Sequence, residues 1–339
     1  MTSFHSIGDL ARSYQLRLGQ QQLKLRLEQL SQEMTTGIRA DIPKAVGGDV
    51  SGISYIESQL KMLAAFQQNA SEAQGRLAAM QAVLGQVQSV TDDLGPGLLG
   101  ETGTLDEGGL RSRIDEIARD FRSLFDALNT NIGGRYLFSG SRTDAAPLGD
   151  FDDMLAALDA AVAGATSAAD IAANIDAWFD APPGTGGFAD TVYQGDDSGS
   201  TQLAVSPDRS IDSDLTANSA GLRDMMKGMA IIAHAAEAGA AIDAETLRNL
   251  LAEAGTRLVR GSAGLTEARA QLGYQQAIVT QAQARNAAET TALSTARIDL
   301  VGSDPFETVT ALQETETRVQ SLYTLTARLA GLSLTDYLS

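Results

Sequence analysis

The hydrophobic positions near the start of the chain follow the seven-residue rhythm of a coiled coil. Over residues 12–36 their spacing alternates between four and three, and Gln20 is the polar exception in the stripe. This spacing is typical of a helix that packs along another long helix. The apolar members of the stripe are Leu16, Leu23, Leu27, Leu30 and Met34.

A second stripe lies at the other end of the chain. Asp304 can cap a helix, Pro305 suits the first helical position, and Glu307 has the spacing of a capping box, so a helix is predicted to begin here. Two short stripes bury little surface when they pair only with each other, so we expect both to pack against further copies or neighbours. The apolar face of this helix holds Val309, Leu312, Val319, Leu322, Leu325, Leu329 and Leu332.

Between these ends lie four longer helical patterns. Apolar residues recur at helical spacing over residues 53–94, 109–131, 218–237 and 243–300. The proline and glycines of residues 42–52 predict a loop or hinge. The first run should end at "LGPG", because proline does not continue a helix.

The pattern of hydrophobic and polar residues changes in the middle of the chain. Residues 151–164 and 167–180 predict two short helices, and "DTVYQG" (190–195) and "TQLAVS" (201–206) predict strands, with a further strand possible in 209–218. Before them, Tyr136 to Ser139 predicts a short aromatic strand that leaves the helices, after a turn formed by Gly133 and Gly134.

The predicted fold is therefore mainly α, with nested antiparallel long helices in a bundle or coiled coil and a small mixed α+β insertion at the tip. Three domains are expected. Residues 1–41 and 304–339 would form a terminal coiled-coil assembly domain, residues 42–134 and 217–303 a helical bundle domain, and residues 135–216 an acidic insertion.

The charge of the chain is uneven. The net charge is −18, and residues 141–216 hold 14 Asp and Glu against two Arg, a balance of −12. An acidic surface repels nucleic acid and anionic lipid, so neither is expected as a partner. There are no cysteines, no apolar run of 18 residues and no Sec-type signal at the start. We therefore expect no disulfides, no membrane insertion, and a cytoplasmic protein unless an unusual export route operates.

No motif in the sequence predicts chemistry. His5 lies near the start, and in "HAAEA" (234–238) Ala238 occupies the position where a second zinc ligand would be needed. Asp196, Asp197 and Ser198 lack the loop and the terminal glutamate of a calcium site. Neighbouring carboxylates such as those in 152–153 point in different directions on a helix and make poor acid–base partners. No catalytic residues, cofactor or metal are predicted, and the chain is not expected to be an enzyme.

Three segments resemble one known family. "NIGGRYLFSGSRTDAAP" (131–147) resembles the motif with which flagellar hook-associated proteins of the FlgL type leave their helical domain, and "VYQGDDSGSTQLAVSPDRSIDSDLTAN" (192–218) resembles the return segment. The ending from Ser303 is similar to the carboxy-terminal helix that this family shares with flagellins. Within the first segment, the domain-junction motif comprises Gly134, Arg135, Tyr136, Leu137, Phe138, Ser139 and Gly140.

The resemblance implies a structural protein of the bacterial flagellum, a junction protein between hook and filament. It implies export without a cleaved signal, an extracellular location, and terminal helices that order on assembly. The implied partners are further copies of the chain, the first hook–filament junction protein, flagellin and an export chaperone. The residues that would drive assembly are those of the two terminal stripes. Arg135 would cap helix carbonyls or pair with the acidic insertion.

Two other functions remain open at this point. The chain could be a flagellin filament subunit, which would polymerise alone, or a soluble adhesin-like binding module whose acidic segment, residues 141–216, recognises a ligand. One departure from the family also matters, since "DIPKAVGGDVSG" (41–52) replaces the stretch like "PSDDP" that many relatives carry after the first helix.

Overall fold

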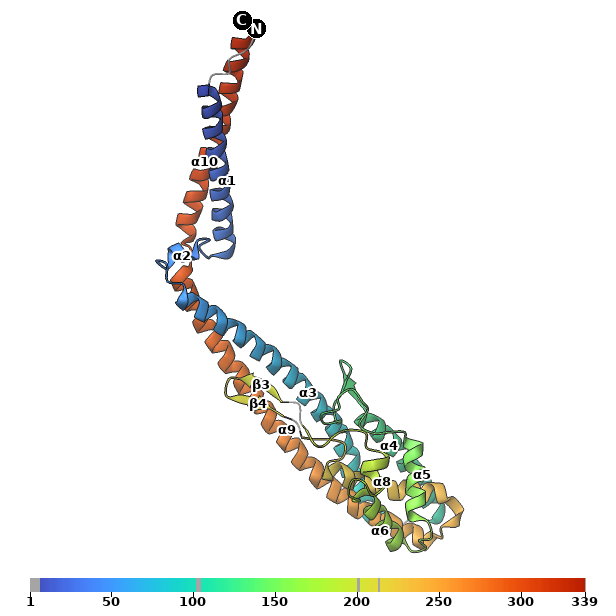
Figure 1. The fold of residues 1–339 in the computed structure, drawn as a ribbon. Coiled ribbons are helices and arrows are strands. Elements are labelled where there is room, and N and C mark those ends of the chain that lie inside the picture. The colour runs from blue at the N-terminus through green and yellow to red at the C-terminus, as the bar shows by residue number, and fades with distance from the viewer. Residues whose placement is uncertain (1–6, 102–104, 200–201, 213, 339) are drawn as a thin grey trace. The chain divides into compact units, whose positions relative to one another are not determined.

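The computed structural model describes residues 7–101, 105–199, 202–212 and 214–338 (Figure 1). Side chains are described for residues 14–100, 105–199, 202–212 and 214–328. The chain divides into two compact units. Unit 1 comprises Met1–Ala64 and Ala287–Ser339, and unit 2 comprises Ala65–Asn286. The predicted mainly α fold, with long antiparallel helices and a few short strands, is confirmed.

Unit 1 is built around two helices from opposite ends of the sequence. Helices α1 (Ile7–Thr36) and α10 (Pro305–Leu338) lie side by side (Figure 1). The cap predicted for α10 is present, since the Asp304 Oδ1 accepts hydrogen bonds from the backbone N–H groups of Phe306, at 2.8 Å, and Glu307, at 3.3 Å. The predicted hinge after α1 contains one turn of helix, α2 (Ile42–Ala45), which Asp41 caps.

The first inner helix is longer than predicted. Helix α3 (Ser51–Glu101) continues through Pro96 and does not end at "LGPG". A proline inside a helix costs about 3 kcal/mol. Here the turn around it is held by packing: Leu94 and Leu98 are buried, and Gly95 lies so close to α9 (Ala244–Val301) that a Cβ there would be 3.1 Å from Val259 Cγ2. Tertiary packing therefore overrides the local signal.

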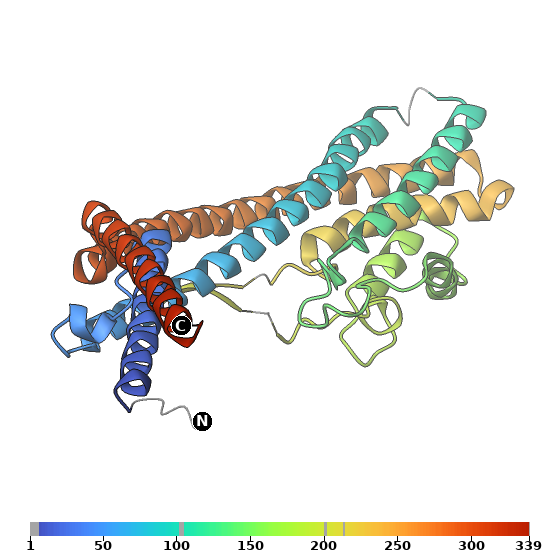
Figure 2. The same ribbon diagram turned by 90° about the horizontal axis from the view of Figure 1, so that it is seen from above.

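Unit 2 contains four further helices of eight or more residues within its described part. Helix α4 (Glu107–Leu128) packs against α8 (Ala220–Ala238), and α5 (Phe151–Val162) and α6 (Ala168–Phe179) pack against each other and against α8 (Figure 2). A 3₁₀ turn, η1 (Gly239–Ala241), follows α8. The helical pattern predicted over residues 109–131 is confirmed up to Leu128, where α4 ends, because the apolar residues that recur at this spacing are buried: Leu110, Ile114, Ile117, Phe121, Leu124, Phe125 and Leu128.

The strands form two separate two-stranded antiparallel sheets. β1 (Asn131–Ile132) pairs with β2 (Arg135–Tyr136), and β3 (Leu203–Ser206) pairs with β4 (Arg209–Ile211). The strands predicted at "TQLAVS" and after it are confirmed. The strand predicted at "DTVYQG" is reduced to an isolated antiparallel bridge between Tyr193 and Leu148. Its first residues belong to a short helix, α7 (Phe188–Thr191), where the Asp190 carboxylate accepts hydrogen bonds from the backbone N–H groups of Gly184 and Gly186.

One hydrophobic cluster fills unit 2. It joins residues of the long helices to residues of the predicted insertion, as in the edge-to-face contacts of Phe151 on α5 with Phe121 and Phe125 on α4. The insertion thus shares its core with the helices around it. This grouping does not decide the three-part domain division drawn from the sequence, which stays a prediction.

Candidate functional site

The predicted assembly stripe of α1 faces α10 but is only partly covered. Leu30 is 2% exposed, whereas Leu16, Leu23 and Leu27 are half-buried and Met34 is 48% exposed. Two helices in contact cover only one side of each other. The structure therefore brings the predicted residues of α1 together on one seam without forming a closed core.

The stripe of α10 is similar. Leu312, Val319 and Leu322 are half-buried, and Leu325 is 52% exposed. The side chains of Leu329 and Leu332 lie outside the described residues. Thr308 and Thr315, which the sequence analysis did not single out, are buried, and their hydroxyls donate to the backbone oxygens of Asp304 and Ala311 in their own helix. Their seven-residue spacing, continued by Leu322, was the available signal.

Helix α1 is apolar on two opposite faces. Tyr14, Leu18 and Leu25 are 63%, 40% and 54% exposed. At 3.6 residues per turn, they lie about half a turn away from the seam that faces α10. This second face was not predicted from the sequence, because its apolar stripe is shorter than the one that faces α10. A helix with two apolar faces needs a partner on each.

Backbone hydrogen bonds join the segment that follows α1 to the segment that links α9 to α10. The Arg39 N–H donates to the Val301 oxygen at 2.9 Å, the Ser303 N–H donates to the Gly37 oxygen at 3.0 Å, and Ile38 pairs with Gly302 as an isolated bridge. Gly37 ends α1 with a φ of +67°. The two stripes are thus anchored at one end by backbone bonds that depend on no particular side chain.

The junction motif begins as a tight hairpin. Gly133 and Gly134, with φ of +59° and +81°, form the two-residue turn between β1 and β2, as the right-handed twist of a hairpin favours. The predicted strand Tyr136–Ser139 is therefore corrected to β2, Arg135–Tyr136. Arg135 takes neither predicted role. Its Nη1 contacts Glu72 Oε1 of α3 at 2.9 Å, an exposed pair.

The rest of the motif binds the exit segment to the return segment. Leu137, Phe138 and Ser139 are buried. The Phe138 oxygen accepts from the Ala217 N–H at 2.9 Å, and the Ser139 oxygen accepts from the Asp196 N–H at 2.9 Å. The chain thus leaves and re-enters the long helices at one place.

Gly140 completes this crossing. Its φ is +65°, and a Cβ on it would lie 1.9 Å from the Asp196 oxygen. No other residue type fits there without displacing the return segment.

Asp196 and Asp197, considered in the sequence as calcium ligands, instead hold this junction together. Asp196 accepts hydrogen bonds from Ser141 and Ser198, which lower its pKa to about 2. Asp197 accepts from Tyr193 and Thr216, each at 2.7 Å. Burial and the Asp197 contact raise the pKa of Tyr193, so this phenol stays protonated.

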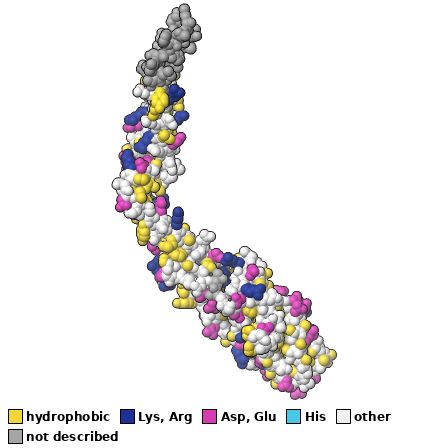
Figure 3. Space-filling view, in the orientation of Figure 1, with side chains coloured by type: hydrophobic (Ala, Val, Ile, Leu, Met, Phe, Trp, Pro, Cys, Tyr) yellow, Lys and Arg dark blue, Asp and Glu magenta, His cyan; other side chains and the backbone are white. Residues whose placement is uncertain are grey.

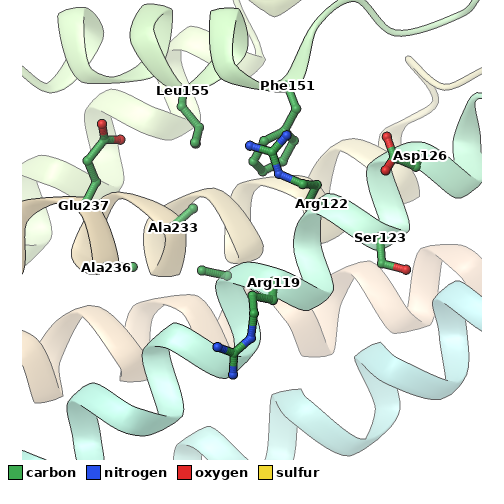
Figure 4. A pocket seen from close by; sticks show the side chains of 10 residues that line it. Arg119, Arg122, Ser123, Asp126, Phe151, Leu155, Ala233, Ala236 and Glu237 are labelled. Atoms are coloured by element: carbon green, nitrogen blue, oxygen red, sulfur yellow. The ribbon is translucent and has the colours of Figure 1, made fainter.

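The groove beside α4, α5 and α8 has no arrangement typical of a catalytic site. Its volume is about 620 Å³. Arg122 of α4, Phe151 of α5 and Glu237 of α8 are among the side chains that line it (Figure 4). The Arg122 guanidinium stacks 4.5 Å from the centre of the Phe151 ring and pairs with Asp152. Nearby, His234 Nδ1 lies 2.8 Å from Asp159 Oδ1. Burial and Asp159 raise the pKa of Glu237. These charged groups contact one another and the core, and no nucleophile stands beside a base.

The described residues contain no group of three or more His, Cys, Asp or Glu side chains that could hold a metal ion. They also contain no helix whose length and apolarity would let it cross a membrane. His5 lies outside the described residues.

Comparison with known families gives the decisive observation. The chain matches the bacterial flagellin N-terminal helical region over residues 7–143 and the bacterial flagellin C-terminal helical region over residues 261–338. Together these regions cover more than half of the chain. It belongs to the flagellin superfamily. The matched regions include α1, α3 and α4 on one side and α10 with most of α9 on the other.

The fold has a counterpart among solved structures. One reported as a candidate flagellar hook-associated protein from Vibrio parahaemolyticus is 15% identical, with a TM-score of 0.50 over 73% of this chain and 94% of that one. At this identity the likeness concerns the fold. A comparison with curated proteins finds no match.

Flagellin-superfamily membership gives the chain a structural role in the bacterial flagellum. Members of this family self-assemble and associate with other flagellar components, and they are not enzymes. The terminal helices are therefore the surfaces to consider first, because both lie inside the matched regions. That this particular chain lacks catalytic activity and cofactors stays a prediction.

Proposed function

We propose that this chain is an adaptor at the junction between hook and filament, and that it assembles through its terminal helices. Its partners would be further copies of itself, the first hook–filament junction protein and flagellin. It would leave the cell through the flagellar type III export channel, with an export chaperone and without a cleaved signal. The resemblance of residues 131–147 and 192–218 to hook-associated proteins supports the junction role.

The proposed assembly mechanism rests on where the exposed apolar side chains lie. Of the sixteen large apolar side chains that are exposed among the described residues, twelve belong to unit 1, which is the smaller unit. They include Tyr14, Leu18 and Leu25 on the outer face of α1. Figure 3 shows hydrophobic side chains along this part of the molecule. Seven of the twelve lie on α1 and α10. Exposed apolar side chains concentrated in one unit in this way are typical of a surface that other chains cover.

A variant of α1 tests this mechanism directly. Replacing Leu18 and Leu25 by Glu puts two charges on the outer face and leaves the seam with α10 unchanged. We expect the isolated protein to keep its helix content and the cells to lose attached filaments. The matched control replaces Gln15 and Gln22, two exposed residues beside that face, by Glu and should assemble normally. Normal filaments in the Leu18/Leu25 variant would refute assembly through this face.

A second experiment separates the terminal helix from the remainder of the chain. Deleting residues 1–35 should leave a soluble protein with the core of unit 2 intact, which no longer joins hook to filament. The single Trp, Trp178 of α6, reports folding of unit 2 by fluorescence. If cells with the truncated chain make normal flagella, the terminal helices are not the assembly device.

The second candidate function is a filament subunit. The matched regions are those of flagellin itself, which favours it. Electron microscopy of cells lacking this chain distinguishes the two. Intact hooks without filaments, with flagellin lost to the medium, are expected for a junction protein. Long homopolymers formed by the purified protein alone would favour the filament subunit instead.

A further inference from the structure

A small apolar pocket lies beneath the β1–β2 hairpin of unit 2. Its volume is about 260 Å³, and its floor is mainly apolar. Ile132, which is 51% exposed, lies at its edge on the hairpin. We call this pocket the arginine pocket, after Arg76 and Arg135 in its lining. The residues that line it are Ser71, Glu72, Ala73, Gly75, Arg76, Ile132, Arg135, Tyr136, Leu137, Thr143 and Leu203.

The rim of the arginine pocket carries a net positive charge. Two of its lining residues, Arg76 and Arg135, are basic and one, Glu72, is acidic. Glu72 already pairs with Arg135. Arg76 has no salt-bridge partner among the described residues. Burial, followed by the charge of Arg135, lowers its pKa. A guanidinium beside an apolar floor favours a partner that offers both an aromatic or aliphatic group and a negative charge.

The same unit presents such a group on α9. Tyr274 is 71% exposed, the largest exposed fraction of a large apolar or aromatic side chain in the described part of unit 2. The shallow depression beside it is lined by Asp212 and Glu267 and by no basic residue. Neither carboxylate has a salt-bridge partner among the described residues. We call Tyr274 with these two carboxylates the tyrosine patch.

The two surfaces lie at the same level of the paired helices α3 and α9. Gln81 bonds to Arg269, Gln88 bonds to Thr266, and Asp92 bonds to Ser262, so the helices run antiparallel in a fixed register. Continuing that register places Tyr274 at the level of Arg76.

The two surfaces lie on different helices of the pair, the arginine pocket on α3 and the tyrosine patch on α9. The β3–β4 hairpin lies across the pair, with Asn69 of α3 donating to the Ala204 oxygen of β3 and Gln281 of α9 accepting from Arg209 of β4. The arginine pocket includes Leu203, on the β3 side, and the depression beside Tyr274 includes Ser210 and Ile211, on the β4 side.

We propose that Tyr274 of one copy enters the arginine pocket of a neighbouring copy, with Asp212 and Glu267 of the first copy facing Arg76 and Arg135 of the second. Copies that stand side by side at the same height and in the same orientation would make this contact with no axial shift. The contact is heterologous, since two different surfaces meet, and it repeats from copy to copy. Tyr and Arg are also the side chains that most often dominate interface energies.

This contact rests on the proposed function, because it supposes that copies lie next to one another in the flagellum. It is distinct from the terminal helices, since all its residues belong to unit 2. It therefore needs a test that reports the contact and the assembly separately.

Cysteine cross-linking gives that test, because the chain has no cysteine of its own. Two full-length variants, Ser71→Cys at the pocket and Ala270→Cys at the tyrosine patch, are produced together in the parent bacterium in place of the native chain. After oxidation of isolated flagella, we expect a disulfide-linked dimer that contains one copy of each. The control pair combines Ala270→Cys with Ser123→Cys, an exposed serine on α4, and should give none.

Adding Tyr274→Ala to the Ala270→Cys chain should lower the dimer yield at least about tenfold, whereas Tyr274→Phe should keep it. Charge reversal checks the polar half of the contact. Arg135→Glu and Glu267→Arg should each lower the yield, and the two changes combined should restore it.

The outcomes are distinguishable. Normal filaments without the Ser71–Ala270 dimer would overturn this contact and leave the proposed function intact. Absence of the native chain from isolated flagella would overturn both.

Discussion

At the residue scale, the junction between the exit and return segments depends on a few groups with little freedom. The backbone oxygens of Phe138 and Ser139 accept the hydrogen bonds that join the two segments, and Gly140 permits their close approach. The carboxylates of Asp196 and Asp197 accept hydrogen bonds from the surrounding hydroxyls. The sequence motif was visible in advance, but its role was not. A Cβ on Gly140 would lie 1.9 Å from the Asp196 oxygen. This close approach depends on the tertiary structure, so a local sequence pattern does not predict it.

Gly140→Ala is expected to destabilise unit 2 strongly. A non-glycine residue at positive φ costs roughly 1–2 kcal/mol, and here the methyl group also collides with the Asp196 oxygen. Gly164→Ala is the matched control, with a φ of +85° and no atom within 4 Å of the added Cβ. Urea unfolding followed by Trp178 fluorescence should show a loss of about 3 kcal/mol or more for Gly140→Ala and about 1 kcal/mol for Gly164→Ala. Equal losses would contradict the close approach.

Asp196 predicts a pH dependence. Its pKa in the folded protein is lowered from 3.8 to about 2, first by the Ser141 hydroxyl and then by Ser198. A carboxyl group with a lowered folded pKa stabilises the protein above its unfolded pKa, and that stability is lost as pH falls through the folded value. The stability difference between the native chain and Asp196→Asn should therefore be constant above about pH 5 and shrink between pH 4 and pH 2. A difference that did not change over this range would show that the hydroxyls do not favour the ionised form.

At the element scale, local signals predicted the helices well where packing agreed with them. The helical spacing of α4 and the Asp304 cap of α10 are as predicted, because amphipathic spacing and capping are local properties. Pro96 shows the limit of such signals, since the close contact of Gly95 with α9 keeps α3 continuous. The outer apolar face of α1 was readable from the sequence, but it became meaningful only when the structure showed that α10 covers the opposite side.

The attachment of α6 to the long helices gives a test at this scale. Arg257 of α9 is 8% exposed and contacts Asp176 of α6 at 2.6 Å and Glu253 at 2.7 Å. Arg257→Ala leaves these carboxylates without their cation and should cost about 3 kcal/mol in unfolding free energy. Arg285→Ala is the control, because Arg285 pairs with Asp208 at 3.2 Å in an exposed position, and such pairs contribute roughly 0–1 kcal/mol. If chemical denaturation gives similar losses for the two variants, burial does not determine how much these ion pairs contribute to the unfolding free energy.

At the scale of the whole molecule, the two units differ in how completely their apolar side chains are buried. Unit 2 has a continuous core that includes the residues of the predicted insertion. In the described part of α1 and α10, Leu30 is the single large apolar side chain that is fully buried, while Tyr14, Leu18 and Leu25 face outward. The sequence predicted that the terminal stripes would be marginal, since two short helices offer each other few partners. The place of the chain among flagellar components required the family comparison, because shared helical patterns do not distinguish a junction from a filament.

Hydrogen exchange of the backbone amides tests the central claim most directly, namely that the terminal helices acquire their stability from neighbouring molecules. The measurement compares the dilute, isolated chain with the same chain in purified flagella, and follows residues 14–36 and 305–328 against α4 as an internal reference. We expect the terminal segments to exchange much faster than α4 in the isolated chain and to become protected in flagella. Equally slow exchange of the terminal segments and α4 in the isolated chain would contradict the account.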